Sequence, residues 1–513
     1  MNHVNQNPFH PDAQWIGLEG GWPSDSTEEH RTLPARYLRR FYTIPAPVVS
    51  AEAVVSGLGA YDFFVNGTAV DDRIGAPGYT NFRKRALFVR YVLDHRIHEG
   101  DNTVGIVLGN GRFFAPRYAS PTRFTDFGYP RLLFSLSIGC EDGTIVTVVS
   151  DSQWSVTDTG PIRTNNEYDG ETYDSRREMP GWSKPHEKPA TERPSHAALW
   201  RPADILAAPT TRLDEHDYPP DRITRTIPAK TIAPSPEGGW IVDFGENFYG
   251  CVRCRVAGPR GAIASWTAAY SLDDDGTLRT RDNRDAHSTD TFILSGTGET
   301  EVWNPRFRGQ GMRRIHIHEW PGTPDLSSVE GLAIHADMRF AGCFSCSDPQ
   351  VQQIAENIRR GQRMYRRHGV PLDPDRNERQ GWLGDVGANS ASDLWNWDIE
   401  RFYRKWLIDI ALDQKADGQL PDVSPAIWPF YSKSIAWPSA FLLIMQNLYR
   451  FTGDLSVLHE RYPTLRRWIH WVQVVLPASI HELPGLSLKI STNWRGVMIH
   501  FSSGKWAVFP VIR

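Results

Sequence analysis

The segment from residue 373 to residue 385 holds the side chains best suited to chemistry. It reads Asp-Pro-Asp-Arg-Asn-Glu-Arg-Gln-Gly-Trp-Leu-Gly-Asp, so four carboxylates lie close to two arginines and a tryptophan. Because ionised carboxylates repel one another, at least one of them is expected to hold a proton near neutral pH. A protonated carboxyl beside ionised ones, with an aromatic face for a sugar ring, suits the cleavage of glycosidic bonds. The alternative is a charged loop, punctuated by Pro and Gly, that only joins two helices.

The composition of the chain excludes several classes of function. A length of 513 residues is enough for several domains, and a net charge of −4 without a basic stripe argues against nucleic acid as a partner. No apolar run reaches the length of a membrane span, and residues 1–15 lack the basic and apolar regions of a signal peptide. We therefore predict a cytoplasmic protein with no membrane partner. The chain is rich in aromatic residues (19 Trp, 17 Tyr and 23 Phe), and some of these rings are expected to stack on sugar faces.

The five cysteines form two Cys-x-x-Cys pairs, at 251 and 254 and at 343 and 346, with the fifth at 140. That spacing could hold zinc or a redox pair. Cys251 and Cys254, however, lie in a strand-like run, in which positions three apart point to opposite faces. The acidic triplet at 273–275, followed by Gly276, resembles part of a calcium loop but lacks its later ligands, which favours a solvated turn. We predict no metal site and no cofactor.

A β pattern extends from about residue 10 to residue 340. Short alternating or β-branched runs, separated by turn clusters, recur at 60–65, 103–108, 131–138 and 144–149. Many short strands with regular turn signals predict β-sandwiches or jelly rolls, and Asn66-Gly67 predicts a tight hairpin turn. Residues 183–237 are rich in Pro, Ser and Thr and indicate a linker or a long strap, with a second β unit beginning near Trp240.

After about Ser347 the spacing of the apolar residues changes from the period of a β-strand to that of a helix. Asp348-Pro349 predicts the start of a helix that carries Val351, Ile354 and Ile358 at helical spacing. A second helix is predicted from Ile399, Phe402, Trp406, Leu407 and Ile410, and two more over 437–450 and 455–475, with a break at Gly453-Asp454. The C-terminal third is thus predicted to be all-α, with the acidic segment in a loop after its first helix.

The acidic segment resembles the signature of the bacterial-type α-L-rhamnosidases. Residues Arg376-Asn377-Glu378-Arg379-Gln380-Gly381-Trp382-Leu383-Gly384-Asp385 follow the family pattern Arg-Asp-Glu-Arg-x-Gly-Trp-x-Gly-Asp, except at Asn377. Three further stretches, at 168–182, 243–250 and 413–422, resemble family segments and occur in the family's order. The resemblance implies two β-sandwich or jelly-roll domains, at 10–205 (N-terminal) and 215–340 (concanavalin-like), followed by a partial (α/α)6 six-hairpin catalytic domain at 345–513.

The resemblance also implies an activity and roles for single residues. It implies hydrolysis of terminal non-reducing α-L-rhamnose residues by an inverting acid/base mechanism. Glu378 would be the general acid, and Asp373 and Asp385 would bind sugar hydroxyls. Trp382 and Trp437 would wall the sugar site, and Arg379 would pair with a carboxylate to orient it. The implied partners are small rhamnosides or rhamnose-containing oligosaccharides.

The resemblance breaks in the helical part. The family's general base is a glutamate in the second half of the barrel, and no residue of this chain can be nominated for it. About five helices are predicted where a six-hairpin barrel has twelve, so we expect a C-terminally truncated chain, with an apolar helix face left in water and its activity in question. Residues 494–513 do not continue the family pattern. A further departure is Trp437-Pro438-Ser439-Ala440, where many relatives carry Gly-Asp in the middle.

Two other functions remain open from the sequence. One is another six-hairpin glycosidase that acts on a different terminal sugar, although the spacing from Glu378 to Asp385 favours the rhamnosidases. The other is a non-catalytic carbohydrate-binding protein built on the β domains. The sequence also leaves open a homo-oligomer.

Overall fold

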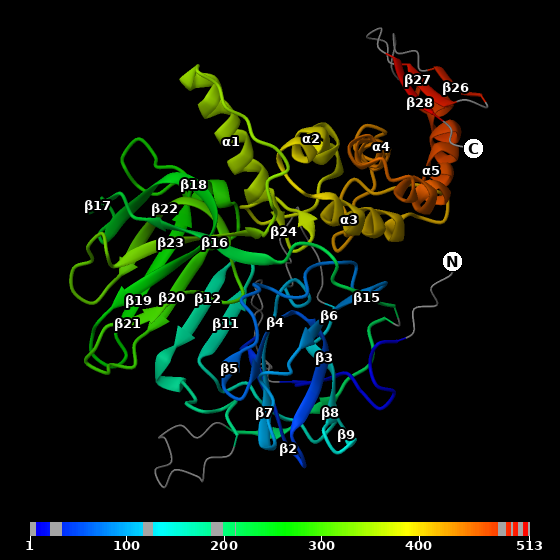
Figure 1. Cartoon of the computed structure of the whole chain (residues 1–513). Coiled ribbons are helices and arrows are strands. Elements are labelled where there is room, and N and C mark those ends of the chain that lie inside the picture. Colours follow the sequence, from blue (N-terminus) through cyan, green and yellow to red (C-terminus); the bar gives the residue numbers. More distant parts are fainter. Residues whose placement is uncertain are drawn as a thin grey trace. The chain divides into compact units, whose positions relative to one another are not determined.

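The computed structural model describes residues 7–20, 33–115, 127–185, 199–210, 212–480, 489–493, 496–500 and 506–510, with side chains as far as residue 475 (Figure 1). The chain forms two compact units. The first comprises Met1–Gly381 and Trp395–Trp406, and the second Trp382–Leu394 and Leu407–Arg513. None of the described helices combines the length and apolar character that crossing a membrane requires.

The first unit begins with a sandwich of two mainly antiparallel sheets. The seven-stranded sheet has the order β14 (Asp204–Ile205), β1 (Ile16–Gly17), β8 (Arg131–Cys140), β3 (Val48–Leu58), β6 (Ala86–Val92) and β15 (Leu213–Glu215), with β9 (Ile145–Val149) also on β8. The six-stranded sheet has the order β13 (Arg201–Pro202), β10 (Ser155–Thr157), β2 (Arg36–Ile44), β7 (Gly100–Gly109), β4 (Ala60–Val65) and β5 (Thr68–Ala69).

The core of the sandwich lies between these two sheets. Alternate residues of each strand point inward, as the period of two predicts; Val55 and Phe134 come from one sheet, and Leu38 and Ile106 from the other. The four strands predicted at 60–65, 103–108, 131–138 and 144–149 are confirmed by β4, β7, β8 and β9.

The hairpin turn predicted at Asn66-Gly67 is also confirmed. Val65 pairs with Thr68, and the two turn residues have φ angles of 50° and 84°. Positive φ at both central positions is the geometry that joins twisted strands by two residues, and Asn-Gly tolerates it best.

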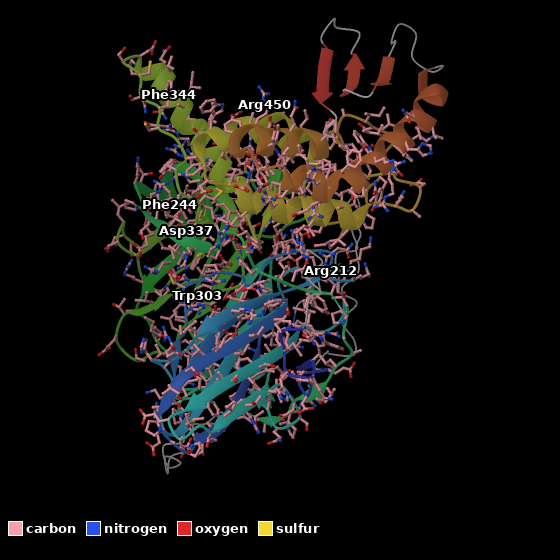
Figure 2. All side chains as sticks on the ribbon, turned by 45° about the vertical axis from the view of Figure 1, so that its right-hand side comes forward. Arg212, Phe244, Trp303, Asp337, Phe344 and Arg450 are labelled. Carbon is pink, nitrogen blue, oxygen red and sulfur yellow. The ribbon has the colours of Figure 1, made fainter. Side chains whose placement is uncertain are left out.

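A ten-stranded sheet forms the second β part of the first unit. Its order is β11 (Ile162–Asn166), β12 (Gly170–Asp174), β20 (Thr289–Ile293), β19 (Ile263–Ala269), β22 (Gln310–Glu319), β18 (Trp240–Val256), β23 (Val329–Ala336) and β16 (Asp221–Pro228). Strands β17 (Thr231–Pro234) and β21 (Glu301–Trp303) also pair with β18. Phe244 and Trp303 belong to its apolar core and are marked in Figure 2.

The strands of the ten-stranded sheet are not contiguous in sequence, and several of them come before Trp240, where the second β unit was predicted to begin. β11 and β12 reach it from the N-terminal part through the parallel pairing of β12 with β20. β16 and β17 come from the Pro-rich stretch, whose described residues act as a strap because β13, β14 and β15 pair with strands of the sandwich. Strand pairing over such sequence separations has no local signal.

The first cysteine pair occupies two different apolar clusters. Cys251 packs with Tyr249, Leu332 and Ile334, whereas Cys254 packs in the main core of the ten-stranded sheet. The prediction that the two thiols point to opposite faces of a strand is therefore confirmed. Asp273 accepts the N–H of Gly276 at its carbonyl, and its carboxylate pairs with Arg279 and Arg281, as expected of a charged surface turn.

Five helices follow the β parts. They are α1 (Pro349–Tyr365), α2 (Leu383–Asn396), α3 (Glu400–Asp413), α4 (Ala440–Thr452) and α5 (Ser456–Ile480). The side chain of Asp348 caps α1 by accepting from two backbone N–H groups, and Gly453 ends α4 with a left-handed backbone, as predicted. α2 was not predicted: it begins inside the acidic segment, whose Gly and Asp residues obscured the helical period.

The C-terminal third is not entirely helical. The strands β24 (Arg366–Arg367) and β25 (Val370–Pro371) form a small hairpin after α1. The strands β26 (Lys489–Asn493), β27 (Gly496–His500) and β28 (Trp506–Pro510) form an antiparallel sheet near the C-terminal end of the sequence. The prediction of an all-α third is thus wrong in these two places, because short strands carry too few residues to show a period of two.

Helix α1 carries an exposed apolar face. Val351, Ile354 and Ile358 recur at helical spacing as predicted, and Ile354 is 58% exposed. Phe344 is also exposed and lies in the loop that leads into α1 (Figure 2). An exposed apolar face of this kind favours association.

Glu171 on β12 makes the stability of the first unit sensitive to pH. Its carboxylate is fully buried and accepts the backbone N–H groups of Arg306 and Phe307, each at 3.0 Å. Burial raises the pKa of Glu171 from 4.5 to about 8, although the two N–H groups oppose this. The folded chain therefore binds this proton more tightly than the unfolded chain does, and the stabilisation is complete below pH 4.5 and lost as pH rises through about 8.

We expect the midpoint of thermal unfolding to fall as pH rises from about 5 to about 8.5. Glu171→Gln has no proton to lose at this position, so its midpoint should depend less on pH over the same range. Parallel pH profiles of the two proteins would contradict the assignment.

Candidate active site

The acidic segment begins with a loop in the first unit that is anchored to the ten-stranded sheet. The backbone N–H of Gly311 on β22 donates to the carbonyl of Pro374 at 2.6 Å, and Arg367 donates to the carbonyl of Asp373. Asp373 itself is half-buried. These bonds hold the start of the loop by its backbone.

Glu378 presents its carboxylate at the surface between two arginines. Its side chain is 14% exposed, with one oxygen 3.3 Å from Arg284 and the other 3.9 Å from Arg376. Its carbonyl accepts from Nε2 of Gln380 at 2.7 Å and from the Tyr168 hydroxyl at 3.4 Å. The backbone is thus held from within the protein, while the carboxyl is partly exposed.

Arg379 does not make the carboxylate pair that we predicted for it. It is completely buried, and its guanidinium donates to the backbone carbonyls of Arg376, Glu167 and Gly309. A planar guanidinium with several donors suits this task, because each carbonyl in the interior needs a partner. Within the first unit, Arg379 holds the backbone next to Glu378 in place.

Asn377 replaces the aspartate of the family signature and has a distinct partner. Its side-chain amide is buried and donates to the carboxylate of Asp285. An aspartate at this position would bring two carboxylates into contact and would require one of them to be protonated. The amide makes the same contact without that cost, which accounts for the departure from the signature.

The carboxyl whose pKa is raised in this loop is Asp375. Burial raises the pKa of Asp375, while the cations Arg376 and Arg379 pull it down. The sequence predicted a proton on one of the four carboxyls because they repel one another. Burial acts on the pKa of Asp375 in the predicted direction, but through loss of water and not through repulsion between carboxylates.

The second unit holds the rest of the acidic segment. Trp382 forms an isolated bridge with Val423, and the N–H of Leu383 donates to the carbonyl of Asp422 at 2.9 Å. Asp385 is exposed in the first turn of α2, where the helix dipole favours a negative charge. Its carboxylate is thus available to a ligand.

Aromatic side chains cluster around Trp382. The rings of Trp428 and Phe430 stack with centroids 5.7 Å apart, and both meet the Trp382 ring edge-on, at 6.4 and 5.9 Å. Sequence reasoning missed Trp428 and Phe430, although the run Trp-Pro-Phe-Tyr at 428–431 was a visible signal. Partly exposed aromatic faces in one cluster can bind the apolar side of a sugar ring.

Trp437 precedes α4 and is 40% exposed, so it is not a core residue. Its indole lies against Gly384, at a position where an added Cβ would come within 2.5 Å of the ring. Gly384 therefore allows the indole to approach the first turn of α2.

We expect Gly384→Ala to displace the Trp437 indole, and to weaken the sugar binding that the family resemblance implies for Trp437 about as much as Trp437→Ala does. The double variant should lose no more affinity for the sugar than either single variant does, because both substitutions act on the same contact. Gly361→Ala in α1 is the matched control, since an added Cβ there meets nothing within 4 Å. It should only stabilise its helix, by about 0.5–1 kcal/mol. Sugar titration by calorimetry measures the loss, and unchanged affinity of the Gly384→Ala variant would contradict the prediction.

The predicted site residues are thus divided between the two units. Asp373, Glu378 and Arg379 belong to the first, and Trp382, Asp385 and Trp437 to the second. Among the residues that the structure describes, no three His, Cys, Asp or Glu side chains are grouped as metal ligands would be.

Three matches to known domain families cover most of the chain. Residues 46–225 match the α-L-rhamnosidase N-terminal domain, and residues 234–335 the bacterial α-L-rhamnosidase concanavalin-like domain. Residues 339–486 match the bacterial α-L-rhamnosidase 6 hairpin glycosidase domain. The chain belongs to the bacterial-type α-L-rhamnosidase family. The signature at 376–385 lies within the last of the three matches, as expected of a family catalytic segment.

Two curated α-L-rhamnosidases are similar to most of the chain. The chain is 31% identical over 447 residues to an α-L-rhamnosidase of Streptomyces avermitilis, covering 86% of the chain and 42% of the relative. It is 29% identical to one of Formosa agariphila, covering 89% of the chain and 49% of the relative. The chain spans about half the length of the curated relatives it matches.

Two solved rhamnosidases show the same fold. The structure of α-L-rhamnosidase from Dictyoglumus thermophilum superposes with a TM-score of 0.82 at 32% identity, over 94% of this chain and 53% of that one. The Streptomyces avermitilis enzyme complexed with L-rhamnose superposes with a TM-score of 0.79 at 30% identity, over 86% and 42%.

Proposed function

We propose that the chain acts on α-L-rhamnosides, releasing terminal rhamnose with inversion, and that Glu378 is the general acid. The observation that carries the proposal is Glu378 itself. It lies in the family signature, its carboxyl reaches the surface, and its backbone is bonded to buried groups on the inner side. L-Rhamnose is bound to one related rhamnosidase, which supports the same sugar here.

The proposed chemistry begins with proton transfer. Glu378 donates its proton to the glycosidic oxygen as the bond to the anomeric carbon breaks, and water attacks from the opposite face of the ring. The general base that activates this water is not assigned to any described residue.

The other site residues take binding roles in this proposal. Asp373 and Asp385 accept hydrogen bonds from rhamnose hydroxyls. Trp382 and Trp437 present apolar faces to the ring carbons and to the C6 methyl, where removal of water from carbon surface contributes to binding. Rhamnosides and rhamnose-containing oligosaccharides are the proposed substrates.

The experiment is hydrolysis of an aryl α-L-rhamnoside by the purified chain, with the aryl glycosides of other terminal sugars as comparison. Proton NMR of the first product should show β-L-rhamnose, because inversion changes the anomer. Release of another sugar in preference to rhamnose would contradict the proposed substrate. No hydrolysis, together with stabilisation by L-rhamnose in a thermal unfolding experiment, would favour a carbohydrate-binding protein instead.

A further inference from the structure

A buried arginine of the N-terminal sandwich contacts the backbone next to Glu378. Arg112 follows β7 and is separated from the catalytic loop by more than half of the chain. One terminal nitrogen donates to the carbonyl of Arg379 at 2.6 Å, 267 residues away in sequence. Its other two nitrogens donate hydrogen bonds to the carboxylate of Glu167 at 2.9 and 2.6 Å.

Glu167 and Tyr168 extend this contact to Glu378. They form part of the turn between β11 and β12, and both are buried. The carbonyl of Glu167 accepts from Arg379, and the Tyr168 hydroxyl donates to the carbonyl of Glu378 at 3.4 Å. The two peptide groups that follow Glu378 are therefore bonded to one buried cluster, formed by Arg112, Glu167, Tyr168 and Arg379.

The cluster is charged although it is almost completely buried. Burial alone would raise the pKa of Glu167, but Arg112 more than offsets this and holds it below its ordinary value. A charge pair in the interior costs free energy unless its geometry and further bonds are good, and here each donor of the fork has an acceptor. Lysine could not replace Arg112, because one ammonium cannot span the carboxylate and the carbonyl.

The loop that this cluster holds has an unusual backbone. Arg376 and Arg379, on either side of Glu378, have φ angles of 64° and 45°. Non-glycine residues in the left-handed region cost roughly 1 kcal/mol or more each, so surrounding contacts must enforce the conformation. The contacts that do so at Arg379 are those of the buried cluster.

We propose that Arg112 and Glu167 are positioning residues for Glu378, which set the place of the acid from the β part of the protein. The inference rests on the proposed function for its catalytic consequence, but the ordering of the loop can be measured without catalysis. Neither residue touches the reacting atoms in this proposal. Arg112 acts through the carbonyl of Arg379, and Glu167 acts through Arg112 and through the side chain of Arg379.

The test compares Arg112→Met with Arg85→Met. Arg85 is also buried and pairs with Asp214 at 2.8 Å, so its loss removes a similar ion pair away from the catalytic loop. Hydrogen exchange of the peptides that cover residues 376–381 is measured by mass spectrometry, alongside the thermal midpoint, kcat and KM.

Arg112→Met should speed exchange in these peptides about tenfold or more, since it removes a charged hydrogen bond. It should lower kcat about 10- to 100-fold with little change in KM, because a small misplacement of a catalytic group costs this much. Arg85→Met should lower the thermal midpoint but should change neither the hydrogen exchange of residues 376–381 nor kcat. Arg112→Lys keeps the charge but loses the fork, and should restore neither the exchange protection nor kcat.

The inference is overturned if folded Arg112→Met and Arg85→Met show the same exchange in residues 376–381. Should Arg112→Met not fold, Tyr168→Phe decides, because it removes only the hydroxyl bonded to the carbonyl of Glu378; unchanged exchange there counts against the inference. If the unaltered chain hydrolyses no rhamnoside, the proposed function fails, while the exchange comparison still decides the positioning role.

Discussion

Replacing Glu378 with glutamine should lower kcat/KM for rhamnosides with poor leaving groups by about 10²–10⁴-fold, the usual contribution of a general acid. Glutamine keeps the shape of the side chain but has no acidic proton for the leaving oxygen. The loss should shrink as the leaving group improves, because a dinitrophenolate departs without protonation whereas a sugar alkoxide does not. The measurement is kcat/KM for a series of rhamnosides with leaving groups of increasing acidity.

The matched control is Glu356→Gln on α1, an exposed glutamate whose carboxylate accepts a hydrogen bond from Gln352 in the preceding turn. It should leave every rate unchanged. An equal loss on good and poor leaving groups would show that Glu378 does not act as the acid, even if the variant is less active. Circular dichroism confirms that both variants are folded before their rates are compared.

Replacing Arg308 with methionine should destabilise the first unit by about 3–5 kcal/mol, because it leaves a buried carboxylate without its cation. Arg308 and Asp290 pair at 2.8 Å, and neither side chain is exposed by more than 2%. Burial raises the pKa of Asp290, and Arg308 opposes this. In the variant, Asp290 should therefore take up a proton. The loss of stability should be smaller at low pH, where this proton is bound more readily.

The thermal midpoint should fall by roughly 5–15 °C at neutral pH, as expected for a loss of this size. Arg401→Met is the control, because Arg401 and Asp217 also pair at 2.9 Å but are 71% and 73% exposed. Arg401→Met should lower the free energy of unfolding by less than about 1 kcal/mol. A double variant, Arg308→Met with Asp290→Leu, should be more stable than Arg308→Met alone. If it is less stable, the penalty does not come from the unpaired carboxylate.

Local patterns in the sequence predicted most elements and the position of the acid. The hairpin at Asn66-Gly67 follows from two residues that tolerate positive φ, and the cap at Asp348 from a side chain two residues before its donor. The family signature, with Glu378 at its centre, is equally local. Helix α2 was missed because its first turn carries Gly384, Asp385 and Gly387, which local propensity assigns to loops.

The position of β11 and β12 in the ten-stranded sheet could not be predicted from local sequence patterns. Their sequence marks them as strands, but their pairing with β20 depends on residues more than 100 positions away. Two strands of similar composition can join either sheet, and the choice depends on the packing of whole faces. The same holds for β16, which lies in a stretch that composition assigns to a linker.

The sequence by itself determined the family, the order of the domains and the residue proposed as the general acid, because each depends on residue types at short, defined spacings. Only the tertiary structure decided what holds that acid. Arg379 bonds to backbone carbonyls instead of a carboxylate, Asn377 meets Asp285, and Arg112 reaches Glu167 and the acid loop from a distant strand end. These contacts join residues with no relation in the sequence. Their free energy comes from burial, which depends on the whole fold.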